Sequence, residues 1–183
     1  CSGIERDTLA KLPEFSPYIH FLVSEGRLDE ARGLWFGVVG GIYARPGNPL
    51  PGLWNGSFES DIDRNLAQFD WTVASNEYAK PGVDSNASHS GNRSLRIDFT
   101  GRDTTRLDGQ DKQMLLLNPG ARYRLECYVK SERFESPEGP RIVVADSSNS
   151  REIASSGPIP SGTDDWRGIA FEFKASATDR AAV

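Results

Sequence analysis

Apolar residues in the first 44 positions recur at helical spacing. Tyr18, Phe21 and Leu22 fall at positions i, i+3 and i+4, as on one face of an α-helix. After Gly26, which is typical of a helix end, a second stretch carries acidic residues in its first turn and one apolar stripe: Asp29, Glu30, Ala31, Leu34, Trp35 and Val38. The pattern predicts a helical hairpin over residues 1–44.

The pattern breaks at residues 45–53. Three prolines and two glycines occur among these nine residues, which excludes a helix and disfavours a central strand. We therefore expect a short, semi-rigid linker here.

From residue 54 onward the apolar period is two. Leu95, Ile97 and Phe99 alternate with Arg96 and Asp98, as in a strand with one buried face. Similar short strands are predicted at 113–117, 121–131, 140–147 and 166–175, with a turn at residues 118–120. Many short strands separated by turns are typical of a sandwich or jelly roll. The predicted fold class is mainly β, with an N-terminal α-helical hairpin.

Composition and charge exclude several classes of protein. Of the 183 residues, 37% are hydrophobic and 10% aromatic, which is enough for a packed core. The formal net charge of −5 argues against a nucleic-acid partner. The longest apolar stretch, "LWFGVVGGIYA", is too short to span a bilayer. We expect neither a nucleic-acid partner nor a transmembrane segment.

The two cysteines point to no shared site. Cys127 is predicted on the core face of its strand, so the pair forms neither a disulfide framework nor a metal set. Cys1 could be the lipidated first residue of a bacterial lipoprotein. We favour the alternative, a boundary inside a longer protein, because a helical segment follows almost at once.

The helical stretch resembles the end of a tetratricopeptide-type repeat. In "HFLVSEGRLDEARGLW", Gly26 and Ala31 match the family's turn glycine and the alanine where helices approach closely. One such repeat cannot bury its own faces, and roughly three are needed for stability. Either the natural chain continues upstream or the hairpin packs on the rest of the protein. An ordinary helical hairpin is equally compatible with the pattern.

Five motifs follow one another in residues 54–183. They are "NGSFES", "FDW", "HSGNRSLRIDF", "LLLNPGARYRLECYVKS" and "SGTDDWRGIAFEFKA". In this order they resemble the CenC-like carbohydrate-binding modules, which belong to the galactose-binding-like superfamily. The resemblance implies a jelly-roll β-sandwich that lacks its last strand, because family members carry another strand beyond "SATDRAAV". It indicates the fold more strongly than the ligand.

The same resemblance implies a metal role for Glu59. The matching glutamate in the family often helps to hold a structural Ca²⁺, and Ca²⁺ prefers carboxylate and carbonyl oxygens. Glu59 is therefore the candidate metal ligand, with carbonyl groups of residues 88–94 as companions. The alternative is a solvated glutamate at a strand end. In the same motif Gly56 is expected to adopt an unusual backbone angle, and Phe58 to enter the core.

A sugar site would need an exposed aromatic ring flanked by hydrogen-bonding side chains. Strand alternation places Tyr128 on the face opposite the core, which makes it the best candidate for stacking on a sugar. Gln113, Arg141 and Arg96 are its candidate polar neighbours. The alternative is a surface tyrosine without a ligand.

Other side chains give weaker signals. Trp71 and Trp166 match family positions that are usually in the core, so we assign both to packing. Neither His20 nor His89 has partners that suggest a metal or catalytic site. The motifs of zinc proteases, serine hydrolases and P-loop proteins are absent from the sequence. We expect no catalytic residue and no enzyme.

The sequence favours a non-catalytic glycan-binding module attached to a helical-repeat scaffold. Such a module suits a bacterial envelope or exopolysaccharide-related protein, in the periplasm or cell envelope. The alternative is a protein–protein interaction module that uses the jelly roll as a scaffold. Paired aromatic rings on a sheet face would favour the first hypothesis, and an exposed apolar helix stripe the second.

Overall fold

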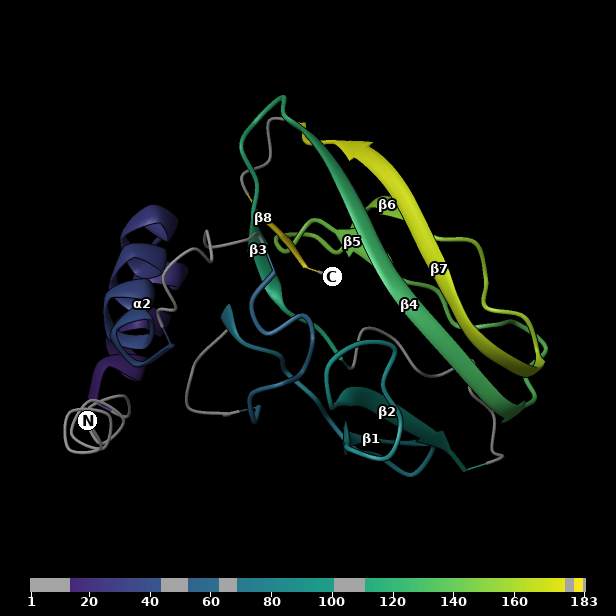
Figure 1. The fold of residues 1–183 in the computed structure, drawn as a ribbon. Helices are drawn as coiled ribbons and strands as arrows, with labels where there is room; N and C mark the ends of the chain where they lie inside the picture. Colours follow the sequence, from purple (N-terminus) through teal and green to yellow (C-terminus); the bar gives the residue numbers. More distant parts are fainter. Residues whose placement is uncertain (1–13, 44–52, 63–68, 101–110, 177–179, 183) are drawn as a thin grey trace.

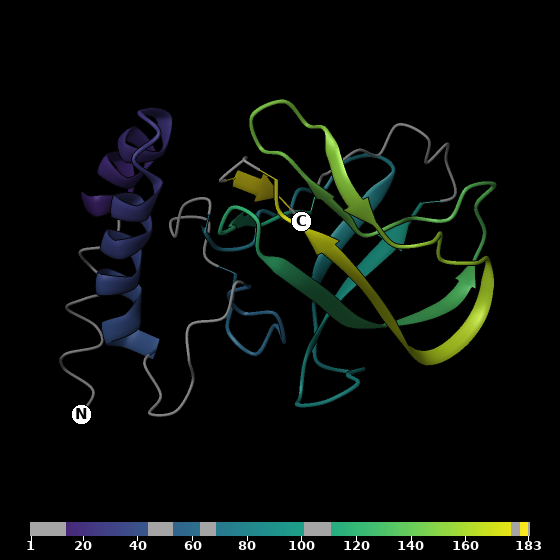
Figure 2. The same ribbon diagram turned by 90° about the horizontal axis from the view of Figure 1, so that it is seen from above.

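The computed structural model describes residues 14–43, 53–62, 69–100, 111–176 and 180–182 (Figure 1). Two short helices lie beside a part built of strands, as Figure 2 shows from above. The described strands form three small antiparallel sheets, with the orders β1-β2, β3-β8-β5-β6 and β4-β7. The fold is therefore mainly β with N-terminal helices, as predicted.

The predicted helical hairpin is present over residues 14–43, and positions 1–13 and 44 of the predicted range lie outside the described residues. Residues 14–24 are helical, and α2 spans Leu28–Tyr43. Between them Gly26 has a φ of 78°, a left-handed angle that glycine adopts without strain. The Gly26 N–H donates to the Val23 carbonyl, which helps to close the first helix. Within the described residues, no helix is long and apolar enough to cross a membrane.

The buried stripe of the first helix differs from the predicted one. Ile19, Leu22 and Val23 are buried, whereas Tyr18 and Phe21 are each 49% exposed. Both stripes share Leu22 and have the same i, i+3, i+4 spacing, so periodicity could not choose between them. The position of the neighbouring helix decides which stripe is covered.

Trp35 joins the hairpin to the β part. This side chain is 1% exposed, and its ring meets Trp54 edge-on at a centroid distance of 5.0 Å. Phe69 lies 5.8 Å from the same ring, and Met114 and Leu116 pack against the same cluster. The hairpin thus packs on the rest of the chain, which is one of the two predicted alternatives. The predicted linker, apart from Leu53, lies outside the described residues.

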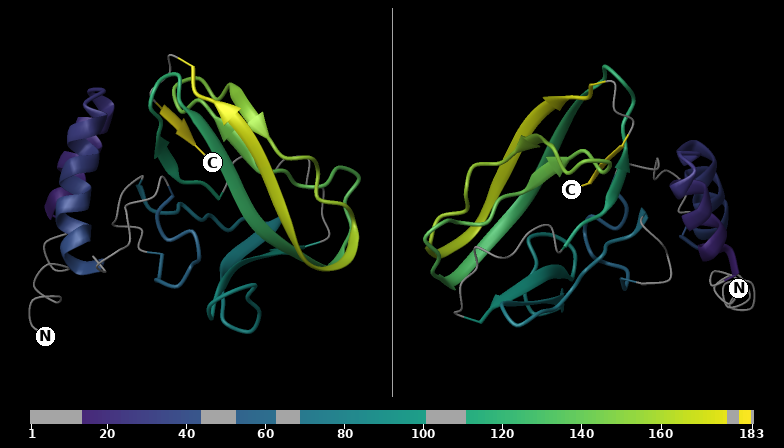
Figure 3. Two further views of the ribbon diagram at one scale, coloured as in Figure 1. Left: turned by 45° about the horizontal axis from the view of Figure 1, so that its top comes forward. Right: turned by 180° about the vertical axis from the view of Figure 1, so that it is seen from behind.

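A long antiparallel pair of strands, which are not consecutive in the chain, dominates the β part. The strands are β4 (Arg122–Phe134) and β7 (Gly162–Lys174), and Figure 3 shows them from two sides. Tyr123 pairs with Phe173 and Leu125 with Phe171. These side chains face a second core around Leu115, Leu117, Val144 and Ala175. Every second residue therefore points inward, and Cys127 lies part-buried on this inner face as predicted.

The remaining strands are short. One sheet pairs β1 (Ala79–Asp84) with β2 (Ser94–Phe99). The other contains β3 (Met114–Leu116), β5 (Val143–Ala145), β6 (Glu152–Ser155) and β8 (Arg180–Ala182). The sequence predicts β2, β3, β4, β5 and β7. It misses β1, whose centre is Pro-Gly, and the four-residue β6.

The described chain ends in a strand that the sequence does not predict. β8 lies between β3 and β5, with Leu115 opposite Ala181 and Ala145 opposite Ala182. Its three residues, Arg180–Ala182, are too few to show an alternation of apolar and polar positions. Only the partner strands on both sides identify them as a strand. The further last strand that the family resemblance implies stays a prediction.

The "NGSFES" stretch is a turn rather than the start of a strand. The Phe58 N–H donates to the Asn55 carbonyl at 3.0 Å. Positive φ angles occur at Asn55 (46°) and Phe58 (57°), not at Gly56 as predicted. A Cβ at Gly56 would lie 2.8 Å from Cδ2 of Leu53. The atom approached is the end of a flexible side chain that can shift, so neither this contact nor the backbone angle requires a glycine at position 56.

Candidate functional site: an aromatic cluster on the β4–β7 sheet

Tyr128 lies on the outer face of β4, where the sequence places it. Its side chain is 45% exposed, and its strand partner on β7 is Gly168. A Cβ at Gly168 would lie 3.5 Å from Cε1 of Tyr128. The tyrosine ring thus rests over bare backbone, and no neighbouring β7 side chain at that position covers it.

His89 and Trp166 complete an aromatic cluster with Tyr128. The His89 ring stacks on the Tyr128 ring at a centroid distance of 3.6 Å and an angle of 6°. Trp166 meets His89 at 6.0 Å and 67°. His89 comes from the loop between β1 and β2, Tyr128 from β4 and Trp166 from β7. We call these three residues the aromatic cluster.

The positions of Trp166 and His89 in the aromatic cluster differ from what the sequence predicts. Trp166 is half-buried against an exposed histidine and not packed within either described core. His89, which carried no signal in the sequence, contacts the predicted stacking residue. Its position in "SHSGNRS" gave no indication of this, because 39 residues separate it from Tyr128 along the chain.

The charged side chains near the cluster are paired. Lys130 donates to Oδ1 of Asp165 at 3.0 Å, and Arg124 lies 3.2 Å from Glu126. Oδ1 of Asp165 also accepts the backbone N–H of Trp166 at 2.9 Å. These bonds, the backbone one foremost, lower the pKa of Asp165. The outer face therefore carries balanced charge around its aromatic rings.

Glu59 binds the loop that carries His89. Its Oε1 accepts the backbone N–H groups of Asn92 at 2.8 Å and of Arg93 at 3.1 Å. Oε2 accepts from the side-chain amide of Asn92 at 3.4 Å. The hydrogen bond from the Asn92 backbone is the main cause that lowers the pKa of Glu59. Glu59 thus meets the predicted loop, but through N–H groups and not through carbonyl groups.

The Glu59 carboxylate is hydrogen-bonded to N–H groups in this structure. Ca²⁺ needs six to eight oxygen ligands, whereas the partners of this carboxylate are nitrogen donors. In the described parts of the chain, no group of three or more His, Cys, Asp or Glu side chains is placed to hold a metal ion. Calcium binding at Glu59 stays a prediction.

The structure does not bring the other predicted ligand residues to Tyr128. Arg96 lies on β2, 2.8 Å from Asp98 and 3.5 Å from Asp84, beside a shallow hollow of about 370 Å³. Arg141 precedes β5 in another sheet, 4.0 Å from Glu152. The four predicted residues are thus divided among three sheets.

Gln113 is placed in the interior. It is 1% exposed, and its Oε1 accepts the backbone N–H of Trp54 at 2.8 Å. Its Nε2 donates to the Trp54 carbonyl at 2.9 Å. Both polar ends of Gln113 are engaged in holding Trp54 against Trp35. Gln113 therefore lies at the junction of the β part with the helices, and not beside Tyr128 on the outer sheet face as predicted.

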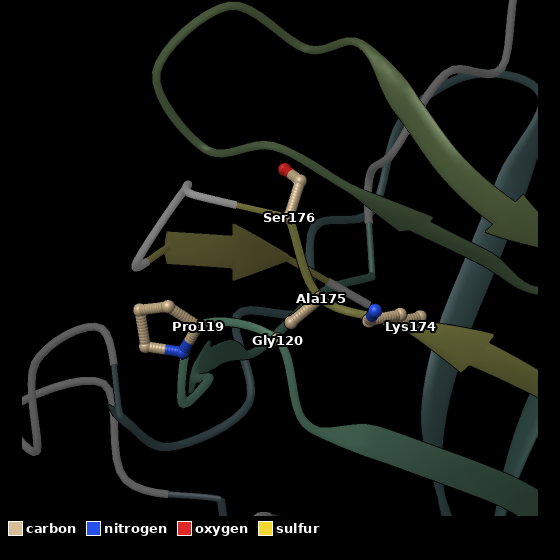
Figure 4. A pocket seen from close by; sticks show the side chains of 5 residues that line it. All are labelled: Pro119, Gly120, Lys174, Ala175 and Ser176. Atoms are coloured by element: carbon tan, nitrogen blue, oxygen red, sulfur yellow. The ribbon is translucent and has the colours of Figure 1, made fainter.

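Another hollow lies at the turn between β3 and β4. Pro119, Gly120, Lys174, Ala175 and Ser176 line it (Figure 4), and its volume is about 520 Å³. Its lining contains one cation and no aromatic ring. It offers nothing on which a ring could stack, so the aromatic cluster remains the stronger candidate site.

Comparison with known protein families and with curated proteins finds no match to this chain. The function is therefore argued from the geometry of the site.

Proposed function

We propose that this protein is a non-catalytic glycan-binding module, in which the aromatic cluster stacks on the face of a pyranose ring. The observation that carries the proposal is the stack of Tyr128, which is 45% exposed, with the exposed His89 on an outer sheet face. Because His89 covers one face of the Tyr128 ring and Gly168 also lies against this ring, the surface that remains for a sugar is the His89 ring together with the edge of Tyr128. Sugar C–H groups pack on such rings, and polar groups at the rim fix the orientation of the sugar.

The ligand that suits this surface is a neutral glycan. Lys130 with Asp165 and Arg124 with Glu126, on the same two strands as Tyr128 and Trp166, each form an ion pair. An acidic polysaccharide would have to break these pairs to bind the cations. A neutral sugar can accept and donate hydrogen bonds at the rim without doing so.

The frame suits the proposal as well. Strands of two of the small antiparallel sheets, β3-β8-β5-β6 and β4-β7, contribute to one apolar core, which is compatible with a jelly-roll sandwich of the CenC-like group. The helical hairpin, packed through Trp35, would be the end of a helical scaffold that presents the module. We place such a protein in a bacterial envelope or in exopolysaccharide assembly.

A glycan array tests the proposal with matched tyrosine variants. Wild type should bind selected neutral glycans, Tyr128→Ala should lose that binding, and Tyr128→Phe should keep most of it. Tyr18→Ala is the control, because Tyr18 is equally exposed but lies on the first helix. If folded wild-type protein binds no glycan on the array, the proposal fails.

A second candidate function is protein–protein interaction through the first helix. Tyr18 and Phe21 are each 49% exposed, and their rings lie 6.1 Å apart and nearly parallel, at 19°. Exposed apolar rings next to each other are typical of contact surfaces. A protein partner whose binding is lost in Tyr18→Ala but kept in Tyr128→Ala would favour this second candidate.

A further inference from the structure

The loop that carries His89 is bound from outside by the segment that carries Glu59 and Asp61. Within the loop, the Ser88 hydroxyl donates to the Gly91 carbonyl at 3.1 Å and the Ser94 hydroxyl to the Ala87 carbonyl at 2.7 Å. These bonds are local and fix only the shape of the loop. Glu59, which lies 33 positions before Asn92, connects the loop to the turn at residues 53–60.

We propose that Glu59 is a positioning residue of the glycan site, which holds the loop by hydrogen bonds so that His89 stacks on Tyr128. For its effect on ligand binding, this inference rests on the proposed function. Its structural part concerns the protein without a ligand and is tested separately.

Two features of the contact support this role. A carboxylate that accepts backbone N–H groups forms charge-assisted hydrogen bonds, which are shorter and stronger than neutral ones. Oε1 of Glu59 accepts two of them, from consecutive residues, Asn92 and Arg93. The guanidinium of Arg93 donates back to the Glu59 carbonyl at 3.3 Å. The loop is thus tied to Glu59 at several atoms.

Gly91 is required for this approach. Its φ is 73°, a left-handed angle that disfavours other residues. A Cβ at this position would collide with Oε1 of Glu59. His89 lies two residues before this glycine, so the glycine sets the path of the chain between the Glu59 contact and the aromatic cluster.

The arrangement replaces the function expected of a metal ion. A structural Ca²⁺ would tie the "NGSFES" turn to the loop through oxygen ligands. Here the same two segments are joined directly, by a carboxylate and backbone N–H groups. The loop should therefore keep its position without a cation.

NMR of the protein without a ligand tests this inference. The His89 ring protons lie over the Tyr128 ring, so the ring current should shift their resonances upfield. Glu59→Ala and Gly91→Ala should remove most of this shift, and Glu59→Gln, which keeps one oxygen acceptor, should remove less. Asp61→Asn is the matched control. It breaks the exposed ion pair with Arg93 at 2.7 Å and leaves both loop N–H bonds intact.

Unchanged amide resonances of β4 and β7 confirm that each variant is folded. A His89 shift that persists in Glu59→Ala would overturn the inference. Adding Ca²⁺ should leave the Asn92 and Arg93 amide resonances in place. If millimolar Ca²⁺ moves them in wild type but not in Glu59→Ala, the site is a metal site and the inference is wrong.

A second measurement separates this inference from the proposed function. The glycan that wild type binds best on the array is titrated into Glu59→Ala and Asp61→Asn. Because the freed loop must be ordered on binding, Kd should rise about threefold to tenfold in Glu59→Ala only. If wild type binds no glycan, the proposed function fails, while the His89 shift still decides whether Glu59 positions the loop.

Discussion

Two groups of aromatic residues in this protein use similar side chains in opposite ways. Trp35, Trp54 and Phe69 meet at the junction of the helices with the β part, and Trp35 is 1% exposed. Tyr128, His89 and Trp166 meet on the outer sheet face, and Tyr128 is 45% exposed. The first group excludes water by itself, whereas the second leaves apolar ring surface in contact with water.

The polar side chains that support the two aromatic groups also differ in burial. At the junction, Gln113 is buried and both its polar ends bind the Trp54 backbone. At the outer face, Glu59 acts from the surface and binds the loop behind His89. The distances and angles between the rings do not distinguish a packing cluster from a binding surface. The burial of the rings, and whether the polar side chain that supports them is buried or exposed, do distinguish the two.

Removing Trp35 should have the largest effect on stability. Trp35→Ala leaves a cavity in the junction, and large core aromatic residues cost about 3–5 kcal/mol on truncation to alanine. Urea unfolding followed by circular dichroism measures the change. The exposed Phe21→Ala on the preceding helix is the control, and it should stay within about 0.5 kcal/mol of wild type. Equal losses of unfolding free energy in Trp35→Ala and Phe21→Ala would contradict the distinction between buried and exposed aromatic rings.

Removing the amide of Gln113 should have an intermediate effect. Gln113→Leu leaves the buried Trp54 N–H and carbonyl without these side-chain partners, at a cost of about 1–3 kcal/mol. The same unfolding assay measures it. Arg141→Ala, which was grouped with Gln113 in the sequence but is exposed, should cost less than about 0.5 kcal/mol. An unchanged free energy of unfolding in Gln113→Leu would mean that the Gln113 amide does not stabilise the fold.

Removing Tyr128 should cost little stability. The ring is half-exposed, so Tyr128→Ala should change the free energy of unfolding by less than about 1 kcal/mol. The comparison with Trp35→Ala is direct, because both changes remove one aromatic ring. A loss as large as that of Trp35→Ala would assign the outer cluster to packing and remove the basis of the proposed site.

Lowering the pH should weaken the hydrogen bonds between Glu59 and the loop that carries His89, while the junction around Trp35 stays folded. The folded pKa of Glu59 is lower than that of the unfolded chain, whose usual value is 4.5. Its stabilising effect is therefore complete above about pH 4.5 and declines as the pH falls through the folded pKa. The amide shifts of Asn92 and Arg93 should be flat above pH 5 and change below it. In Glu59→Gln this change should disappear.

Much of the framework could be predicted from local patterns. Alternation identified β4 and β7, placed Tyr128 outward and Leu125 inward, and located the turn after β3, where Gly120 has a φ of 76°. These features depend on residues a few positions apart, so local sequence is sufficient. The position of Gly26 in the helical turn was predicted for the same reason.

The errors have a common cause as well. The sequence could not choose between the stripe of Tyr18 and that of Ile19, because both have helical spacing. It grouped Gln113 and Arg141 with Tyr128 by chemical type alone, without knowing which sheet each strand joins. β8 is too short to be recognised without its neighbours β3 and β5.

The sequence by itself therefore determined the helical hairpin, the strands β2, β3, β4, β5 and β7, and the face of its strand on which Tyr128 lies. Tertiary structure alone decided that His89 stacks on that ring and that Glu59 holds the loop behind it. Hydrophobic periodicity is a property of the residues within one helix or strand, so a short segment of the sequence is enough to detect it. Contacts between side chains 30 to 40 positions apart depend on how the sheets and turns pack, and no local pattern encodes them.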